Sequence, residues 1–319
     1  MATIPAKRDI CFGKALGLVV ALFLSITIFA PGCGKARPAR KVSLYQLTPD
    51  GKEDPALARA PLRVAIAGVI SPKATIQSYE GLQVYLSEKL DRPVELVQRP
   101  TYADVNDLLR SGQAEVGLVC TYAYVKGNRE FGLELLAAPE VEGKATYRSL
   151  VIVPRESSYR RLEDLRGKVF AFTDPMSFSG HVAPLYMLDR LGKRAHSFFG
   201  RYIFTYSHDN SIKAVADGLV DGAAVDSLVY DYLRERNPQV TDRVRVLASS
   251  DAVGTPPVVV PRGLDPELKA RLKEVILGMH EDPLGRQALR QIMVDRFVPV
   301  NDRAYEPVRV MARKVGFEP

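Results

Sequence analysis

The sequence predicts an α/β protein of two lobes, each a mixed sheet flanked by helices, joined by two hinge segments. Three observations support this fold class. Short β-like apolar runs alternate with helix-like segments from Leu62 onward, which favours a sheet rich in parallel strands. A second alternating set begins near residue 155. The last part of the chain is helical and too small for its own domain, so we expect it to cover the first lobe.

The first set of elements follows directly from periodicity. Leu82, Leu86 and Leu90 recur at helical spacing, and residues 102–109 form a second helix. Strands are expected at residues 62–67, 94–97, 115–120, 133–137 and 149–153. Each strand is a short apolar run bounded by polar or turn residues.

The second set repeats this pattern and is followed by the helical tail. Strands are expected at residues 168–173, 202–206, 221–225 and 244–247, and helices at 208–216 and 228–234. Residues 256–260 look extended, and helices follow at 266–279, 284–293 and 305–315. We therefore assign residues 62–148 with 256–319 to lobe 1 and 149–255 to lobe 2. The hinge segments lie near 147–155 and 248–258.

The amino terminus has the pattern of an export signal. Lys7 and Arg8 precede an apolar run over residues 15–30, and small residues lead to Cys33. A cysteine at this place resembles a bacterial lipoprotein cleavage site, although Ala30 stands where leucine is usual. We expect a signal peptide over 1–32, lipid on Cys33 and a flexible tether over 33–61. The alternative is a retained anchor, but the run is short for a span of ~20 residues. Both interpretations place the folded part of the chain outside the cytoplasm, close to a bacterial membrane.

The net charge of +7 is concentrated near the amino terminus. Residues 1–32 carry +2 and residues 33–61 carry +3, which leaves +2 for residues 62–319. No basic stripe with interleaved aromatic residues occurs along the body, so a nucleic-acid partner is not expected. We expect a monomer.

Cysteine and histidine usage indicates neither disulfides nor metal. Cys11 lies in the leader and Cys33 is the lipid site, so Cys120 is alone in the folded part. The four histidines are scattered, which makes a structural zinc site unfavourable. No cofactor is expected.

The segment DPMSFSGHVAPLYML, residues 174–188, indicates anion binding. It places Ser177, Ser179 and Gly180 where a strand gives way to a helix. The first N–H groups of a helix lack partners and attract a phosphate-like group. Serine hydroxyls donate to its oxygens, and glycine permits close backbone approach. The alternative is a simple serine cap on the helix.

Two segments carry a family resemblance, 174–188 and SHDNSIKAVADGLVDGAAVDS at 207–227. Together with LEDLRGK at 162–168 and DPLG at 282–285, they resemble the phosphonate/phosphite-type substrate-binding proteins of bacterial ABC importers. The likeness runs in order over residues 62–319. It implies a type II periplasmic-binding fold that closes on a small anion, delivery to a permease, and no catalysis.

The resemblance implies further contacts with the anion in lobe 2. His208 matches a ligand-contacting position, the alternative being a satisfied surface histidine. His181 either donates to the ligand or lies only in the first helical turn. Phe178 replaces the usual threonine, so it either faces the core or contacts an organic substituent, and the identity of the anion stays open.

Asp226 suggests how related anions are distinguished. It ends a strand, and a carboxylate beside an anion is favourable only where the ligand keeps a proton that the carboxylate accepts. Monoprotonated phosphite or phosphate meets this condition and sulfate does not. The alternative is a cap on the helix starting near Leu228. Because Leu228 also stands near the amine-binding glutamate of some relatives, we expect a compact ligand without an amino group.

Lobe 1 is expected to supply the opposite wall of the site. Tyr79 is placed at the start of the first helix, and Thr121 and Tyr122 follow a strand, at loops where open α/β sheets bind ligands. Tyr102 and Tyr124 are expected to be packing or rim residues, and Cys120 a buried thiol at the end of that strand.

The sequence also bears on two other classes of function, an enzyme and a sensor. An enzyme with a nucleophile elbow needs Gly-x-Ser-x-Gly, and residues 174–182 lack the first glycine. No phosphate loop or dinucleotide motif occurs either. A sensor that reports the anion to a membrane signalling protein has the same fold and is not separated from transport by the sequence. Another small oxyanion or an organic acid also remains open as the ligand.

Overall fold

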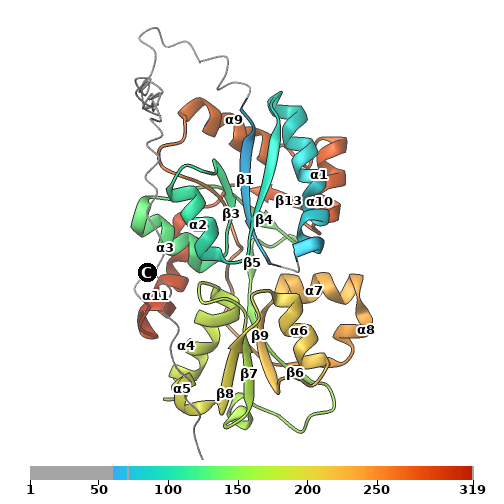
Figure 1. Ribbon diagram of the computed structural model, residues 1–319, viewed down its shortest axis with the longest axis vertical. Coiled ribbons are helices and arrows are strands. Elements are labelled where there is room, and N and C mark those ends of the chain that lie inside the picture. Colours follow the sequence, from blue (N-terminus) through green and yellow to red (C-terminus); the bar gives the residue numbers. More distant parts are fainter. Residues whose placement is uncertain (1–59, 70–71, 318–319) are drawn as a thin grey trace, which may run out of the picture. The chain divides into compact units, whose positions relative to one another are not determined.

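A computed structural model of the chain describes residues 60–69 and 72–317. The predicted signal peptide, Cys33 and nearly all of the predicted tether lie outside this range. Within it, none of the helices combines the length and apolar character needed to cross a membrane. The described residues form one six-stranded sheet, one five-stranded sheet and a two-stranded ribbon (Figure 1).

The six-stranded sheet of lobe 1 is mixed, with strand order β13-β4-β12-β3-β1-β2. Its strands are β1 (Leu62–Ala67), β2 (Val94–Arg99), β3 (Val116–Leu118), β4 (Glu134–Glu140), β12 (Val258–Val260) and β13 (Arg296–Val298). β1 pairs in parallel with β2 and β3, and β12 pairs antiparallel with β3 and β4. The late strand β12 therefore returns to the centre of the first lobe.

Helices flank this sheet. They are α1 (Pro72–Leu90), α2 (Tyr102–Arg110), α3 (Thr121–Phe131), α9 (Pro266–Leu277), α10 (Pro283–Gln291) and α11 (Glu306–Lys314), with a 3-10 turn η3 (Asp302–Tyr305) before α11. Thr101 and Asp104 form a capping box at the start of α2, which satisfies two backbone N–H groups there. Of the tail helices, α9 packs against β4 and α10 against α1.

The five-stranded sheet of lobe 2 has the order β10-β6-β9-β7-β8. Its strands are β6 (Ser149–Pro154), β7 (Val169–Phe172), β8 (Arg201–Phe204), β9 (Gly222–Asp226) and β10 (Val244–Ser249). Its helices are η1 (Leu162–Leu165), the π-helix η2 (Phe178–Val182), α4 (Ala183–Arg190), α5 (Ala195–Phe198), α6 (His208–Ala216), α7 (Ser227–Arg236) and α8 (Pro238–Thr241). The chain passes between the two large sheets through an antiparallel ribbon, β5 (Thr146–Tyr147) with β11 (Val253–Gly254).

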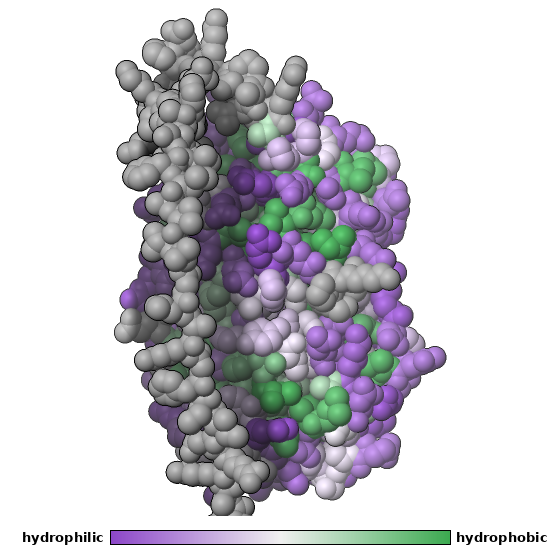
Figure 2. Space-filling model, in the orientation of Figure 1, coloured by the Kyte–Doolittle hydropathy of each residue, from purple (hydrophilic) through white to green (hydrophobic). Residues whose placement is uncertain are grey.

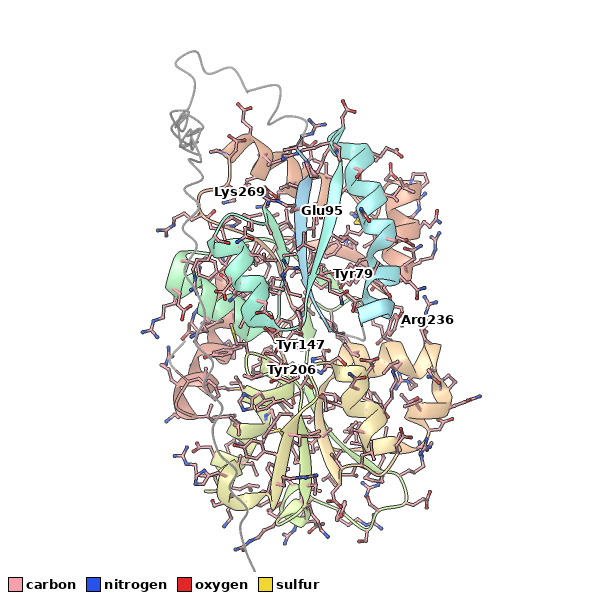
Figure 3. The ribbon with its side chains drawn as sticks, viewed as in Figure 1. Tyr79, Glu95, Tyr147, Tyr206, Arg236 and Lys269 are labelled. Atoms are coloured by element: carbon pink, nitrogen blue, oxygen red, sulfur yellow. The ribbon has the colours of Figure 1, made fainter. Side chains whose placement is uncertain are left out.

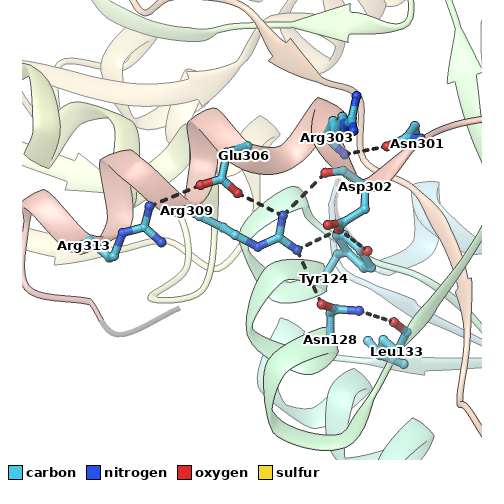
Figure 4. Close-up of polar contacts among 9 residues, drawn as sticks. All are labelled: Tyr124, Asn128, Leu133, Asn301, Asp302, Arg303, Glu306, Arg309 and Arg313. Carbon is cyan, nitrogen blue, oxygen red and sulfur yellow. Dashed lines mark hydrogen bonds and ion pairs between the residues drawn. The ribbon is translucent and has the colours of Figure 1, made fainter.

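The C-terminal helix α11 contacts both lobes. It packs on α3 in lobe 1 and on α4 and η2 in lobe 2. Its lobe 1 side is fixed by polar contacts drawn in Figure 4, where Arg309 reaches Asp302 at 2.7 Å and Tyr124 donates to Asp302 at 2.6 Å. Tyr124, expected to be a packing or rim residue, is buried there against Tyr305.

Most predicted elements are confirmed within a few residues, and two differ. α1 begins at Pro72, so Tyr79 lies two turns inside the helix and not at its start. Proline at the first helical position has a suitable φ and lacks an N–H that would have no partner, so it favours this earlier start. The helix after Asp174 begins with a π-helical turn, which accommodates one more residue than an α-turn.

Candidate functional site

The predicted anion-binding segments meet the end of β3 from lobe 1. β7 and β9 are parallel, so the loops after both strands reach the same edge of the lobe 2 sheet. Hydrogen bonds cross between the lobes: the Phe178 N–H donates to Cys120 Sγ at 3.2 Å, and the Tyr102 N–H donates to Asp174 Oδ2 at 3.3 Å. The site therefore lies where the lobes contact each other.

Ser177 begins the π-helix and acts as its cap. Its Oγ accepts the Gly180 N–H at 2.9 Å and lies 3.9 Å from Cys120 Sγ. It is fully buried, as is Cys120, the predicted buried thiol. The serine cap considered as an alternative is thus present at Ser177, and a ligand contact by the same hydroxyl stays a prediction.

Gly180 is required by packing. A Cβ at this position would lie 2.4 Å from Thr173 Cβ and 2.6 Å from Thr173 Oγ1. The expected reason for this glycine was close approach to a ligand, whereas the described neighbours are the strand end and Ser177. Only glycine allows the π-helix to lie this close to β7.

Gly180→Ala is expected to destabilise the protein by about 1–3 kcal/mol, because the added methyl overpacks a buried contact. A matched control is Gly263→Ala, where a Cβ meets no atom within 4 Å. Urea denaturation of both variants measures the difference. Equal midpoints for the two variants would contradict this packing argument.

Two buried hydroxyls next to Ser177 and His208 have no hydrogen-bond partner within the described part of the chain. They are Ser179 Oγ, in the first turn of the π-helix, and Ser207 Oγ, at the N-cap of α6. Both residues are at most 3% exposed. A buried hydroxyl without a partner costs free energy, so both hydroxyls are available to hydrogen-bond a water molecule or a ligand. Ser207 was not among the predicted site residues, although it lies directly before His208.

His208 is oriented as a hydrogen-bond donor. Its Nδ1 accepts the Asp226 N–H at 3.1 Å and lies 3.2 Å from Thr173 Oγ1. Burial lowers the pKa of His208 to about 3, so the ring is neutral near pH 7. With Nδ1 accepting, the proton of the neutral ring is on Nε2. The alternative, in which His208 is a surface histidine with its hydrogen bonds satisfied, is contradicted because His208 is only 1% exposed.

Asp226 both caps a helix and remains able to accept another hydrogen bond. Its Oδ1 accepts the N–H groups of Leu228 at 2.7 Å and Val229 at 3.4 Å, which is the predicted cap on α7. Oδ2 has no hydrogen bond to any described residue. Burial raises the pKa of Asp226 to about 7, so this carboxyl holds a proton more readily than an exposed one.

The charge of Asp226 acts on several tyrosines. Burial first, and then the charge of Asp226, raises the pKa of Tyr79 to about 12. Burial raises the pKa values of Tyr102, Tyr147 and Cys120 as well, and the charge of Asp226 adds to each of these shifts. Figure 3 shows Tyr79 on the lobe 1 side and Tyr147 at the level where the lobes meet. Tyr147 was missed because its signal, a single tyrosine on a two-residue strand, does not stand out in the sequence.

The remaining predicted residues point elsewhere or act in packing. His181 Nδ1 lies 2.9 Å from the carbonyl oxygen of Pro175, and its ring contacts Phe172, Phe204 and Phe317. Tyr122 packs against Phe317.

Phe178 and Thr121 lie nearer the boundary between the lobes. The Phe178 ring is fully buried against Tyr147, which is the predicted core orientation. Thr121 Oγ1 lies 2.5 Å from the Tyr147 hydroxyl. A ligand contact by either residue stays a prediction, as it does for His181 and Tyr122.

Comparison with known proteins agrees with this geometry. A family model described as "ABC transporter, phosphonate, periplasmic substrate-binding protein" matches residues 64–305. The chain belongs to this family. The resemblance drawn from residues 174–188 and 207–227 is thereby confirmed. The family consists of substrate-binding proteins of ABC transporters, which are extracytoplasmic.

Individual relatives are distant but cover most of the chain. A phosphonates-binding periplasmic protein of Escherichia coli K12 is 24% identical over 71% of this chain and 68% of its own. The phosphate-import protein PhnD of Mycolicibacterium smegmatis is 27% identical over 76% and 81%. The solved structure of PhnD1 from Prochlorococcus marinus, in complex with methylphosphonate, has a TM-score of 0.73 and 19% identity, covering 80% of this chain and 97% of that one. The two-lobed type II periplasmic-binding fold is confirmed.

Proposed function

We propose that the protein binds a compact phosphorus oxyanion, namely a phosphonate, phosphite or phosphate, and delivers it to an ABC permease. The observation that carries the proposal is the pair of buried hydroxyls without partners, Ser179 and Ser207, beside the neutral donor His208. Each sits at the start of a helix, where backbone N–H groups add positive potential. An anion held there needs no lysine or arginine.

Asp226 supports selection of a protonated anion. Its Oδ2 can accept an O–H from monoprotonated phosphate or phosphite, and it repels sulfate, which has no proton to donate. The tyrosines near Asp226 add neutral donors and restrict the space for a substituent.

Thermal unfolding in the presence of candidate anions tests this proposal. Phosphite, phosphate, methylphosphonate, 2-aminoethylphosphonate and sulfate are compared at equal concentration. We expect a rise in melting temperature with at least one phosphorus anion, about 2.7 kcal/mol of added stability at 100 times Kd, and none with sulfate. No rise with any of the five would overturn the proposal.

We also propose that Cys33 is lipidated after removal of residues 1–32 and tethers the protein to the membrane. The support is the charged, apolar and small-residue order of the leader. Cys33→Ala is expected to move the protein from the membrane fraction to the soluble fraction, or to leave it as an uncleaved precursor. A wild-type protein whose mass includes no lipid would refute the lipidation.

A further inference from the structure

Positively charged residues gather at one end of the lobe 2 sheet, where β7 and β8 begin. Residues 159–168 and 189–201 lead into β7 and β8, which run parallel with Val169 opposite Arg201. Together these two segments hold eight Lys or Arg and three Asp or Glu, a net charge of +5. Since residues 62–319 as a whole carry +2, all other residues in that range sum to −3. The fold therefore gathers basic residues that are dispersed in the sequence.

Backbone contacts hold the two segments together. The Gly167 N–H donates to the carbonyl of Phe198 at 2.8 Å, and the Gly200 N–H donates to the carbonyl of Lys168 at 3.0 Å. A Cβ on Gly200 would lie 2.4 Å from the Gly167 oxygen, so glycine permits this close approach. The charges thus form one surface, which we call the basic edge.

Most of these charges are available for a partner. Seven of the eight basic residues are exposed, namely Arg160, Arg161, Arg166, Arg190, Lys193, Arg194 and Arg201. Among the described residues, no ion pair involves Arg166, Arg190, Lys193 or Arg201. Two of the three acids are engaged locally: Asp164 accepts backbone N–H groups at the start of η1, and Asp189 lies 3.6 Å from Arg194.

Apolar side chains are exposed among the charges. Leu191 is 38% exposed and lies between Arg190 and Lys193, while Tyr202 and Ile203 on β8 are 42% and 38% exposed. β8 is the last strand of its sheet, so one of its edges is unpaired. Figure 2 shows apolar side chains beside hydrophilic ones on the visible face of lobe 2. Basic groups mixed with leucine and tyrosine are typical of surfaces that bind at a membrane interface.

We propose that the basic edge is a docking surface for anionic lipid headgroups. Lysine and arginine attract the phosphates of an anionic bilayer, and Leu191 and Tyr202 enter the interface. A nucleic acid is disfavoured because the family is extracytoplasmic and because apolar side chains lie among the charges. The basic edge is at the amino ends of β7 and β8, whereas Ser177 and His208 follow their carboxyl ends. Membrane docking therefore leaves the anion site uncovered, and it does not depend on which ligand binds.

Vesicle binding by the full chain tests this docking. The partition coefficient is measured by flotation with vesicles of phosphatidylcholine alone and of phosphatidylcholine with 30% phosphatidylglycerol, and their ratio is compared between proteins. The ratio removes the apolar contribution of the leader, and the comparison between proteins removes the effect of the charges in residues 1–61, which all variants share. The test variant is Arg190→Glu with Lys193→Glu and Arg201→Glu. The control is Lys273→Glu with Arg290→Glu and Arg303→Glu, exposed residues of lobe 1 that change the net charge equally.

We expect the wild type to prefer anionic vesicles and the test variant to lose at least about 100-fold of that preference, since each basic residue near an anionic surface contributes roughly a factor of 5. The control is expected to stay within about threefold of wild type.

Equal losses in both variants, or no preference in the wild type, overturn the proposal. Binding to heparin without a preference for anionic vesicles also overturns it, in favour of a soluble polyanion. If the glutamate variant does not keep the wild-type melting temperature, the corresponding glutamine variant replaces it; it removes the same three contributions, so a loss of about 100-fold is still expected.

Discussion

Ser179→Ala is expected to weaken anion binding by roughly 10- to 100-fold while leaving the unliganded protein as stable as wild type. Ser179 Oγ is buried and has no partner in the described part of the chain, so its removal breaks no internal hydrogen bond. A hydrogen bond to a charged group contributes about 1.5–3 kcal/mol, which sets the expected loss of affinity. Isothermal calorimetry with the tightest anion of the panel and urea denaturation without ligand measure the two effects.

Ser177→Ala is the matched control, because it removes the same atom two residues away. Ser177 Oγ accepts the Gly180 N–H at 2.9 Å, so its loss is expected to cost about 1 kcal/mol of stability. Comparison of the two variants thus distinguishes a helix cap from a hydrogen-bond donor to the ligand. The reverse pattern, a stability loss in Ser179→Ala with affinity unchanged, would refute the role given to Ser179.

The sequence predicted the lobe 2 half of the site better than the lobe 1 half. In lobe 2, Ser177, His208 and Asp226 each stand at a strand end or helix start, and these positions follow from local patterns. The sequence predicted the bounds of β7, of β9 and of the helices after them within a few residues. Because β7 and β9 are parallel, the loops that follow them lie at the same end of the sheet. Local signals suffice here because each of these residues stands at a strand end or a helix start, although β7 and β9 themselves are far apart in the sequence.

Lobe 1 required long-range information. Tyr79 was placed at a helix start because the beginning of α1 was set too late, and Tyr147 was missed altogether. The proximity of Tyr147 to Thr121 and Phe178 arises from the crossing of the chain between sheets. Such tertiary contacts have no periodic signal in the sequence.

The serine segment shows a limit of a different kind. The hydroxyls of Ser177 and Ser179 looked equivalent in the sequence, yet one caps the π-helix and the other has no described partner. The difference arises because Ser177 is the N-cap, where its Oγ accepts the Gly180 N–H, whereas Ser179 lies inside the first turn of η2. Periodicity of 3.6 residues does not predict it.

The pH dependence of stability is expected to be the sum of two opposed contributions from neighbouring buried groups. Burial raises the pKa of Asp226 from 3.8 to about 7, so its contribution to stability is complete below the unfolded pKa and is lost as pH rises through about 7. Burial lowers the pKa of His208 from 6.5 to about 3, so its contribution is complete above the unfolded pKa and is lost as pH falls toward 3. Each is on the order of a few kcal/mol.

Single substitutions are therefore expected to reveal opposite slopes between pH 4 and pH 7. In Asp226→Asn, which keeps a good helix cap, the free energy of unfolding rises with pH, because only His208 titrates. In His208→Gln it falls with pH, because only Asp226 titrates. The free energy of unfolding of the wild type is expected to change less with pH than that of either variant. The other buried titrating groups, Asp174 and His181, are common to all three proteins. Urea denaturation at several pH values gives the three curves. Parallel curves would mean that neither group titrates differently on folding, which would contradict the raised pKa of Asp226 and the lowered pKa of His208.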